Sequence, residues 1–472
     1  MKLNKRLFIF LLFTLLFVNP GYSQNNVIIT GNAPSYNNET LQFCLINDFI
    51  TDTELPILQF KVGPDGNFSC SVNLGETSML SIELGVYKGL LFTEPGKTYR
   101  LILPPKTAKS TEDRINPYFK PSQIYLEIQD KDNEELNDQI RQFDNCYDSL
   151  LYTEVLHKPY HRLPKNMLDS IITNFDKRYN SYRNQYFKDY RQYKYGFIKL
   201  VASHSSVQSI LKEYFSGMPV LFTNPSYMYL FNQLFNKASC VYNTLNGAFP
   251  GFWENLKTNA VNSVSENKNE IFVPLSDTLK ELIAVKSLYN SFYDKTWPAK
   301  DLKQVLDSVT TNSKIIQIRL IAKNFIEKSC ALAVNSDAPF FELTDRDNQH
   351  VKLTDLKGKY IYLNFCTFWS LPCNEQFGLL NKIHHDHGDQ IEVVTIIGDG
   401  DYRNFIDNLS QKDYNWTFLH FGEDPDIINK YRVLVFPTYY LIDPYGKLVM
   451  SPAPSPGENF EGRFGELMRW RN

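Results

Sequence analysis

The stretch that decides the fold is residues 360–373, which read YIYLNFCTFWSLPC. Residues 360–365 contain no charged side chain, which is typical of a central strand buried on both faces of a sheet. A helical run follows from residue 374 to about residue 385, and a second apolar strand is expected at residues 391–397. Strands that alternate with helices in this way predict an α/β domain with a mixed sheet.

The sequence on both sides extends this pattern. Residues 338–345 and 351–359 predict a β-hairpin that leads into the central strand. Helices are expected at residues 402–410 and 427–431, and residues 433–447 predict a strand pair joined by a tight turn. The C-terminal part of the chain is therefore expected to form one continuous α/β unit.

Several spaced motifs in this part resemble those of a known family. In chain order they are Ala338-Pro339-Phe340, Lys357-Gly358-Lys359, Asn364-Phe365, Trp369 with Pro372-Cys373, and Phe436-Pro437-Thr438. Together they resemble the thioredoxin-like domains of periplasmic thiol–disulfide oxidoreductases of the TlpA type, which are related to the AhpC/TSA peroxidases. The resemblance covers residues 338–469. It implies a thioredoxin fold, a cis peptide bond before Pro437, and a groove beside that bond in which extended substrates bind.

The chemistry that the resemblance implies needs two thiols in a Cys-x-x-Cys motif, and this sequence has one. The first thiol attacks as a thiolate at the start of a helix, and the second resolves the mixed disulfide. Here Ser370 stands at the attacking position and Cys373 at the resolving position. A serine hydroxyl needs an adjacent base to act as a nucleophile, and the local motif contains neither His nor Asp. The peroxidase pattern Thr-x-x-Cys is interrupted at the same place, because residues 367–370 read TFWS.

Cys366 leaves three interpretations open. It lies seven residues before Cys373, and the two can form a redox pair if their Cα atoms lie within about 7 Å. Alternatively, Cys373 acts alone, for example by capturing a mixed disulfide. The third interpretation, which the residues favour, has no redox catalysis. In it Ser370 is a helix N-cap, Pro372 occupies the first turn, and Cys373 is a small buried apolar residue.

The groove implied by the resemblance survives the loss of the attacking thiol. Its candidate residues are Trp369, Pro372, Phe436, Pro437 and Thr438. The sequence therefore predicts an oxidoreductase-like protein whose activity is lost or altered, or a non-catalytic module that binds a peptide or protein partner. Whether the chain is an enzyme stays open.

No motif for a cofactor is present, and we expect none. The run from His384 to His387 has the residue types of metal ligands, and its two end residues share a helix face. However, histidines at a helix C-terminus also interact favourably with the helix dipole, so we assign no metal site there. His157 and His161 flank Pro159, which disfavours a helical ligand pair.

Two further regions precede the α/β part. Residues 26–110 alternate apolar and polar residues between turn signals, which predicts a β-sandwich or barrel-like domain. Residues 111–335 predict a helical region, in which aromatic residues spaced by three and four over residues 175–197 predict the core face of one helix. The thioredoxin-like domain then occupies residues 336–472. The seven expected strands are residues 27–30, 41–46, 57–62, 68–74, 79–84, 90–93 and 99–103, and the further expected helices are residues 133–152, 207–215, 275–293 and 315–328.

The N-terminus predicts export. Residues 1–23 combine a basic start, an apolar run at residues 7–18, and the small residues Gly21 and Ser23, which is the pattern of a secretory signal peptide. We expect the mature protein in the periplasm of a Gram-negative bacterium. No later segment is long and apolar enough to predict a membrane span.

The composition excludes several classes of protein. The chain has 472 residues, enough for two to four domains, and a formal net charge of -3. This charge argues against nucleic acid as a partner, because no basic surface is expected. Seven cysteines are too few for a disulfide scaffold. The oligomeric state stays open.

Overall fold

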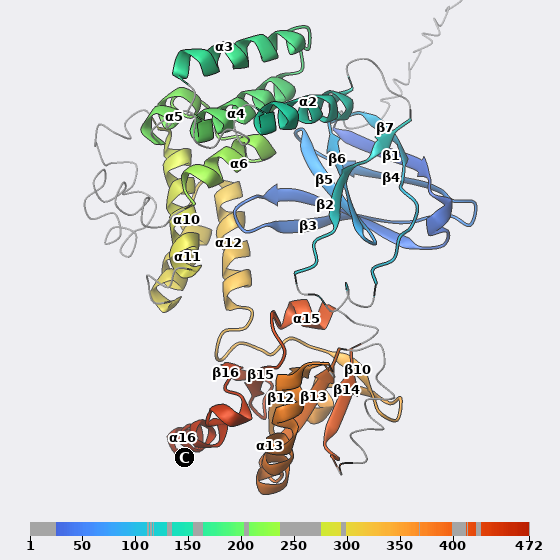
Figure 1. The fold of residues 1–472 in the computed structure, drawn as a ribbon, viewed down its shortest axis with the longest axis vertical. Helices are drawn as coiled ribbons and strands as arrows, with labels where there is room; N and C mark the ends of the chain where they lie inside the picture. Colours follow the sequence, from blue (N-terminus) through green and yellow to red (C-terminus); the bar gives the residue numbers. More distant parts are fainter. Residues whose placement is uncertain are drawn as a thin grey trace, which may run out of the picture.

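The computed structural model describes residues 25–110, 113, 116, 118–129, 135–153, 164–202, 207–236, 275–293, 299–367, 369–398, 412, 414–421 and 426–471. These residues form, in chain order, two small sheets, a group of helices, and a third sheet with its own helices (Figure 1). The predicted fold class, β-rich then helical then α/β, is confirmed. The predicted signal peptide and the predicted helix at residues 402–410 lie outside the described residues.

The two N-terminal sheets share one apolar core, as in a sandwich. One sheet has the strand order β4 (Asn67–Asn73), β1 (Asn26–Asn32), β7 (Thr98–Ile102), β9 (Glu127–Ile128), and the other has the order β3 (Thr53–Lys61), β2 (Thr40–Asp48), β5 (Ser78–Leu84), β6 (Tyr87–Thr93), β8 (Ser122–Tyr125). All seven predicted strands are present. Two further strands, β8 and β9, were not predicted; they follow residue 110 and pair with β6 and β7.

The helical part includes eight α-helices in the described residues. They are α2 (Leu136–Leu151), α3 (Lys165–Asp176), α4 (Gln185–Ala202), α5 (Val207–Tyr214), α6 (Pro225–Leu234), α10 (Asp277–Tyr293), α11 (Ala299–Asn312) and α12 (Ile316–Cys330). The four further helices predicted from sequence correspond to α2, α5, α10 and α12. In Figure 1, α12 runs from this group towards the C-terminal sheet.

The aromatic pattern of residues 175–197 belongs to two helices, so the prediction of one helix is wrong. The chain passes through a short 3-10 turn, η3 (Lys177–Tyr179), before α4 begins. Asn184 precedes α4, and its side-chain oxygen accepts a hydrogen bond from the Phe187 N–H at 3.1 Å. This local capping interaction overrides the three-and-four spacing. The rings still face a shared core, since Phe187 packs edge-to-face on Phe143 of α2 with centroids 5.9 Å apart.

The turn between β2 and β3 is anchored in the helical part through Asp48, which is fully buried. The Asp48 carboxylate accepts hydrogen bonds from the backbone N–H groups of Ile50 at 3.0 Å and Thr51 at 3.1 Å. It also accepts one from Asn324 Nδ2 of α12 at 2.9 Å. Lys328, one turn further along α12, donates to the carbonyl oxygen of Thr51. These contacts fix the C-terminal end of α12 against the sandwich.

The C-terminal sheet has seven strands among the described residues. Their order is β11 (His350–Lys352), β10 (Glu342–Asp345), β14 (Thr417–His420), β13 (Ile391–Ile397), β12 (Tyr360–Cys366), β15 (Thr438–Ile442), β16 (Leu448–Ala453). The predicted hairpin, central strand, second apolar strand and final strand pair are confirmed, whereas β14 was not predicted. Every residue of β12 is buried, and it pairs parallel with β13 and antiparallel with β15.

Helices cover both faces of this sheet. One apolar layer joins the sheet to α13 (Leu371–His387) and α16 (Phe460–Arg471), and the other joins it to α15 (Asp426–Lys430). Side chains alternate along β12, so Tyr362 and Cys366 enter the first layer while Ile361 and Leu363 enter the second. The predicted motif thus begins at the end of the most buried strand.

Across the described ranges, no helix is long and apolar enough to cross a membrane.

Replacing Asp48 is expected to loosen the junction between the sandwich and α12. Asp48→Ala leaves the Asn324 amide and two backbone N–H groups buried without their acceptor, which costs about 2–4 kcal/mol. Differential scanning calorimetry should show a transition at clearly lower temperature. Asp307→Ala, at an exposed ion pair on α11, should shift it little, since such pairs contribute about 0.5 kcal/mol. Equal shifts for the two variants would contradict the anchoring role.

Candidate functional site

The predicted active-site motif lies where β12 ends and α13 begins. Cys366 is the last residue of β12, Ser370 is the N-cap of α13, and Cys373 lies in the first turn. Ser370 has extended backbone angles, φ -80° and ψ 108°, as an N-cap residue should. Pro372 lies in the first helical turn, where its missing N–H costs no intrahelical hydrogen bond.

The hydroxyl of Ser370 is held between two backbone groups. It accepts a hydrogen bond from the Cys373 N–H at 3.4 Å and donates one to the Phe436 carbonyl oxygen at 3.3 Å. Only 5% of Ser370 is exposed. Neither of these partners is a base, and the described part of the chain gives Ser370 no hydrogen bond to an imidazole or carboxylate. The hydroxyl therefore caps a helix and lacks the activation that a nucleophilic serine requires.

The two thiols of the motif are buried beneath α13. Cys366 is 0% and Cys373 is 1% exposed, and both belong to the apolar layer between the sheet and α13. Both are thiols and not disulfide-bonded. Tyr439 belongs to the same apolar layer. Burial, and then the charges that Cys366 and Cys373 would carry as thiolates, raise the pKa of its hydroxyl well above the usual value. Exchange with a protein disulfide needs an accessible sulfur, which neither thiol offers.

Three polar atoms in this region have no hydrogen-bond partner among the described residues. They are Asn364 Oδ1, Thr367 Oγ1 and the Tyr439 hydroxyl. Asn364 and Tyr439 are direct neighbours across β12 and β15. An amide cannot take up a proton at neutral pH, so Asn364 gives the buried thiols no general base.

The loop that faces the motif contains a cis peptide bond between Phe436 and Pro437, as the resemblance implied. The Trp369 and Phe436 rings meet edge-to-face with centroids 6.4 Å apart. Together with the hydrogen bond from Ser370, this contact holds the loop against the start of α13. The structure therefore brings the predicted residues Trp369, Ser370, Phe436 and Pro437 together.

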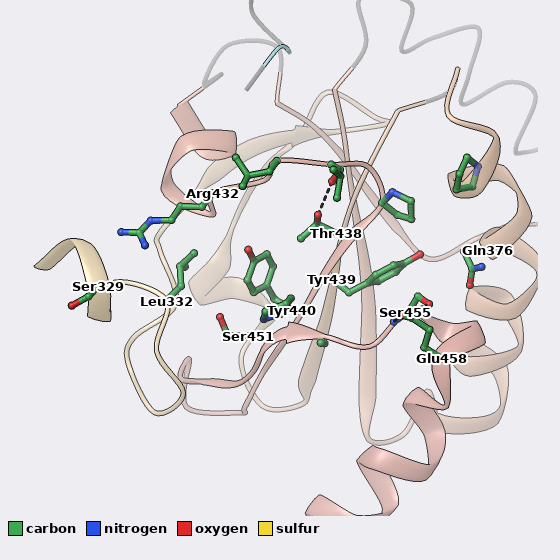
Figure 2. A pocket seen from close by; sticks show the side chains of 16 residues that line it. Ser329, Leu332, Gln376, Arg432, Thr438, Tyr439, Tyr440, Ser451, Ser455 and Glu458 are labelled. Atoms are coloured by element: carbon green, nitrogen blue, oxygen red, sulfur yellow. Dashed lines mark hydrogen bonds between the residues drawn. The ribbon is translucent and has the colours of Figure 1, made fainter. Parts of the chain in front are cut away.

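A groove of about 670 Å³ opens beside this loop (Figure 2). Its lining residues come from four segments: Ser329 and Leu332 at the end of α12, Pro372 and Gln376 on α13, Arg432, Leu434, Val435 and Pro437 to Tyr440 around the cis-proline, and Ser451 to Ala453, Ser455 and Glu458 at the edge of the sheet. Three predicted groove residues, Pro372, Pro437 and Thr438, line it. Trp369 and Phe436 lie beside it and are not among its lining residues.

Large apolar side chains are exposed around this groove. Leu434 is 54% and Val435 is 64% exposed, and Trp369 and Leu371 at the start of α13 are exposed to a similar degree. Exposed apolar side chains that gather beside a groove are typical of interaction sites in soluble proteins. The groove thus combines an apolar surface with nearby backbone groups.

One part of the groove wall was not predicted from the sequence. The bond between Ser451 and Pro452 is also cis, and the pairing of β15 with β16 is irregular next to it. The prolines of residues 452–456 could have predicted an irregular edge strand here, because proline within a sheet is confined to edge strands and bulges. Nothing in the sequence signals that Ser329 and Leu332 reach the groove.

The histidine run at the end of α13 makes surface contacts. His387 Nε2 lies 3.4 Å from Glu461 Oε1 of α16, and the His384 ring packs near Trp416. In the portions of the chain that the structure describes, no group of three or more His, Cys, Asp or Glu side chains is placed to hold a metal ion. His157 and His161 lie outside those portions.

Comparison with known proteins places this domain in a family. A family model described as AhpC/TSA family matches residues 334–451. The chain is 33% identical over 121 residues to the thiol-disulfide oxidoreductase ResA of Bacillus subtilis (strain 168), which covers 25% of this chain and 66% of that protein, just under two thirds. It is 30% identical over 129 residues to ResA of Geobacillus thermodenitrificans (strain NG80-2). This aligned region covers 27% of this chain and 74% of that protein. The chain belongs to the AhpC/TSA family.

The AhpC/TSA domain is also similar to a solved structure. This is a putative thiol:disulfide interchange protein DsbE from Chlorobium tepidum, at 26% identity over 29% of this chain and 97% of that one, with a TM-score of 0.26. The predicted resemblance to thiol–disulfide oxidoreductases is confirmed for the C-terminal part of the chain by the family and sequence matches.

Removing the Ser370 hydroxyl should destabilise the AhpC/TSA domain. Ser370→Ala loses the cap on the Cys373 N–H, and loss of an N-cap costs about 0.5–2 kcal/mol. Urea unfolding followed by near-ultraviolet circular dichroism measures the change. Ser69→Ala, at an exposed position on β4, is the control and should stay within about 0.5 kcal/mol of the wild type. An unchanged midpoint for Ser370→Ala would contradict the capping role.

Proposed function

We propose that this chain is a thioredoxin-like protein of the thiol–disulfide oxidoreductase type that has lost ordinary dithiol exchange and binds an extended segment of a partner protein. The observation that carries the proposal is the state of Ser370. It occupies the attacking position of the motif, and its hydroxyl is engaged by Cys373 N–H and the Phe436 carbonyl. A serine held in this way supplies no thiolate.

The remaining thiols support the same conclusion. A resolving thiol has no role until a mixed disulfide has formed at the attacking position. Cys373 and Cys366 are both buried in the layer under α13, so a large disulfide substrate cannot approach either sulfur without displacement of the helix start. Two alternatives remain for the experiments below to distinguish. In one, Cys366 and Cys373 form a redox pair, and in the other, Cys373 alone forms a mixed disulfide with a substrate.

The binding half of the proposal rests on the groove. The edge strand β16 is the last strand of its sheet in the described residues, and residues 335–337 pair with its start at Lys447 and Leu448. Further along, Ser451 to Ala453 line the groove, and the edge of a sheet is a site at which an extended peptide adds by backbone hydrogen bonds. Exposed apolar side chains beside the cis-proline supply side-chain contacts. Neither feature requires the attacking thiol. Binding therefore survives a substitution that removes exchange chemistry.

The proposal places the protein outside the cytoplasm, in the periplasm of a Gram-negative bacterium. It rests on the signal-peptide pattern of residues 1–23. Disulfides persist in that compartment, so a domain of this family would encounter disulfide-containing proteins there. The proposed partner is a protein and not a nucleic acid.

The wild-type protein should not accelerate the reduction of insulin by dithiothreitol. Turbidity of the released insulin chain measures the rate, and Cys373→Ala should give the same rate as the wild type because neither attacks insulin. A rate that depends on Cys373 would show single-thiol chemistry or a Cys366 couple. Cys366→Ala would then separate those two possibilities.

Restoring the attacking thiol should restore a reducible pair. In Ser370→Cys the new thiol stands at the helix N-terminus, which favours its thiolate. Diamide should accept two electrons and two protons as a disulfide forms between the new thiol and Cys373, and dithiothreitol should reduce it. Maleimide labelling and mass spectrometry measure both steps. The wild type is the control, and a Cys366–Cys373 disulfide formed in it would contradict the proposed loss of redox function.

A further inference from the structure

The groove beside the cis-proline has a cation at one end and a carboxylate at the other. Arg432 lines one end and Glu458 the opposite end, with Thr438, Tyr440 and Tyr439 between them (Figure 2). Arg432 is exposed, and its side chain makes no ion pair with any residue that the structure describes. A groove with a positive charge at one end and a negative charge at the other favours a ligand that places a negative group at the first end and a positive group at the second.

The backbone of Arg432 shows that an arginine is unusual at this position. Arg432 has a positive φ of 46° and follows α15. Its N–H donates to the Asn429 carbonyl at 3.0 Å, and the Val433 N–H donates to the Ile428 carbonyl at 2.9 Å. This pair of hydrogen bonds is a Schellman motif, whose left-handed residue is most often glycine because a side chain there is strained. Arginine is thus retained at a position where its side chain strains the backbone. Strain of this kind is found at functional sites, and here it suggests a role for the side chain at the groove.

A second cation lies near this end of the groove. Lys328 of α12 feels the positive charge of Arg432, which together with burial, the larger cause, lowers the pKa of its ammonium group. Three carboxylates face Lys328 and act in the opposite direction, those of Asp48, Asp52 and Glu54. Lys328 is held by the Asp52 carbonyl at 3.1 Å. Lys328 is not among the residues that line the groove, whereas Arg432 is, so Arg432 is the cation that a ligand in the groove meets.

The other end of the groove carries a rigid negative charge. Glu458 Oε2 accepts hydrogen bonds from the Ser455 N–H at 3.0 Å and the Ser455 hydroxyl at 2.9 Å. These bonds lower the pKa of Glu458, so it stays ionised at neutral pH. Gln376 of α13 accepts a hydrogen bond from the Gly457 N–H at 3.1 Å, which ties this turn to the helix. The carboxylate therefore has a fixed place relative to the groove.

We infer that the groove selects an extended protein segment with an apolar centre, an acidic residue that reaches Arg432, and a basic residue that reaches Glu458. This inference rests on the proposed binding function and names the substrate class of the same site. Apolar contacts with Leu434 and Val435 provide affinity, and the two end charges set the direction and choice of the segment.

Binding of fluorescein-labelled octapeptides to the full mature chain tests the inference by fluorescence polarisation. The set has one apolar centre and carries Glu and Lys at its two ends in both orders, or Gln at both ends. One of the two charged orders should bind more tightly than the Gln peptide, by about three- to fivefold for each charge. Raising the salt concentration should reduce this difference, since the charges are exposed.

Variants at Arg432 make the test specific. Arg432→Gly suits the left-handed backbone, so it should fold at least as stably as the wild type and should lose the preference for the acidic end. Arg432→Glu should favour a basic residue at that end. Arg463→Gln, an exposed arginine on α16, is the matched control and should keep the wild-type preference.

The outcomes separate the inference from the function on which it rests. If all peptides bind equally well, and Arg432→Gly changes nothing, the charge selection is wrong while the binding function stands. If none of the peptides binds, the proposed function fails and the inference with it. Leu434→Asp, at an exposed groove residue, should weaken all of the peptides, and unaltered binding in this variant would show that they bind elsewhere.

Discussion

The whole site depends on one hydroxyl group that starts a helix. Ser370 accepts from the Cys373 N–H and donates to the Phe436 carbonyl, so one side chain fixes the first turn of α13 and the loop before the cis-proline. A hydroxyl is a strong helix cap, whereas a thiol is a poor hydrogen-bonding group. A serine at this position therefore holds the start of α13 and the cis-proline loop together more firmly than a thiol would.

Sequence predicts most of this scaffold because its signals are local. The absence of charge over residues 360–365 locates the central strand of the sheet, and alternation with turn signals finds the seven strands of the sandwich. The order of the motifs from Ala338 to Thr438 indicates a thioredoxin-like domain. The sequence also shows that Ser370 stands three residues before Cys373, where a Cys-x-x-Cys motif would have its first cysteine.

The features that sequence misses depend on distant contacts. β8, β9 and β14 are short, and their pairing with strands elsewhere in the chain defines them. The break between α3 and α4 follows from a capping amide at Asn184 that the aromatic spacing conceals. The groove joins Leu332 to Ser451, residues that only the folded chain brings together. The unusual backbone of Arg432 likewise has no sequence signal, since glycine is the residue expected there.

The contribution of α12 to the groove has a consequence for the rest of the molecule. Leu332 and Ser329 form part of its wall, and the buried carboxylate of Asp48 holds the end of α12 against the sandwich. A ligand that contacts Leu332 would therefore alter the stability of the junction between α12 and the sandwich. By linkage, a change in that junction would alter the affinity for the ligand by the same free energy. A chain cut at residue 336 keeps the sheet of the thioredoxin fold but lacks Ser329 and Leu332, so the groove is complete only when the preceding part of the chain is present.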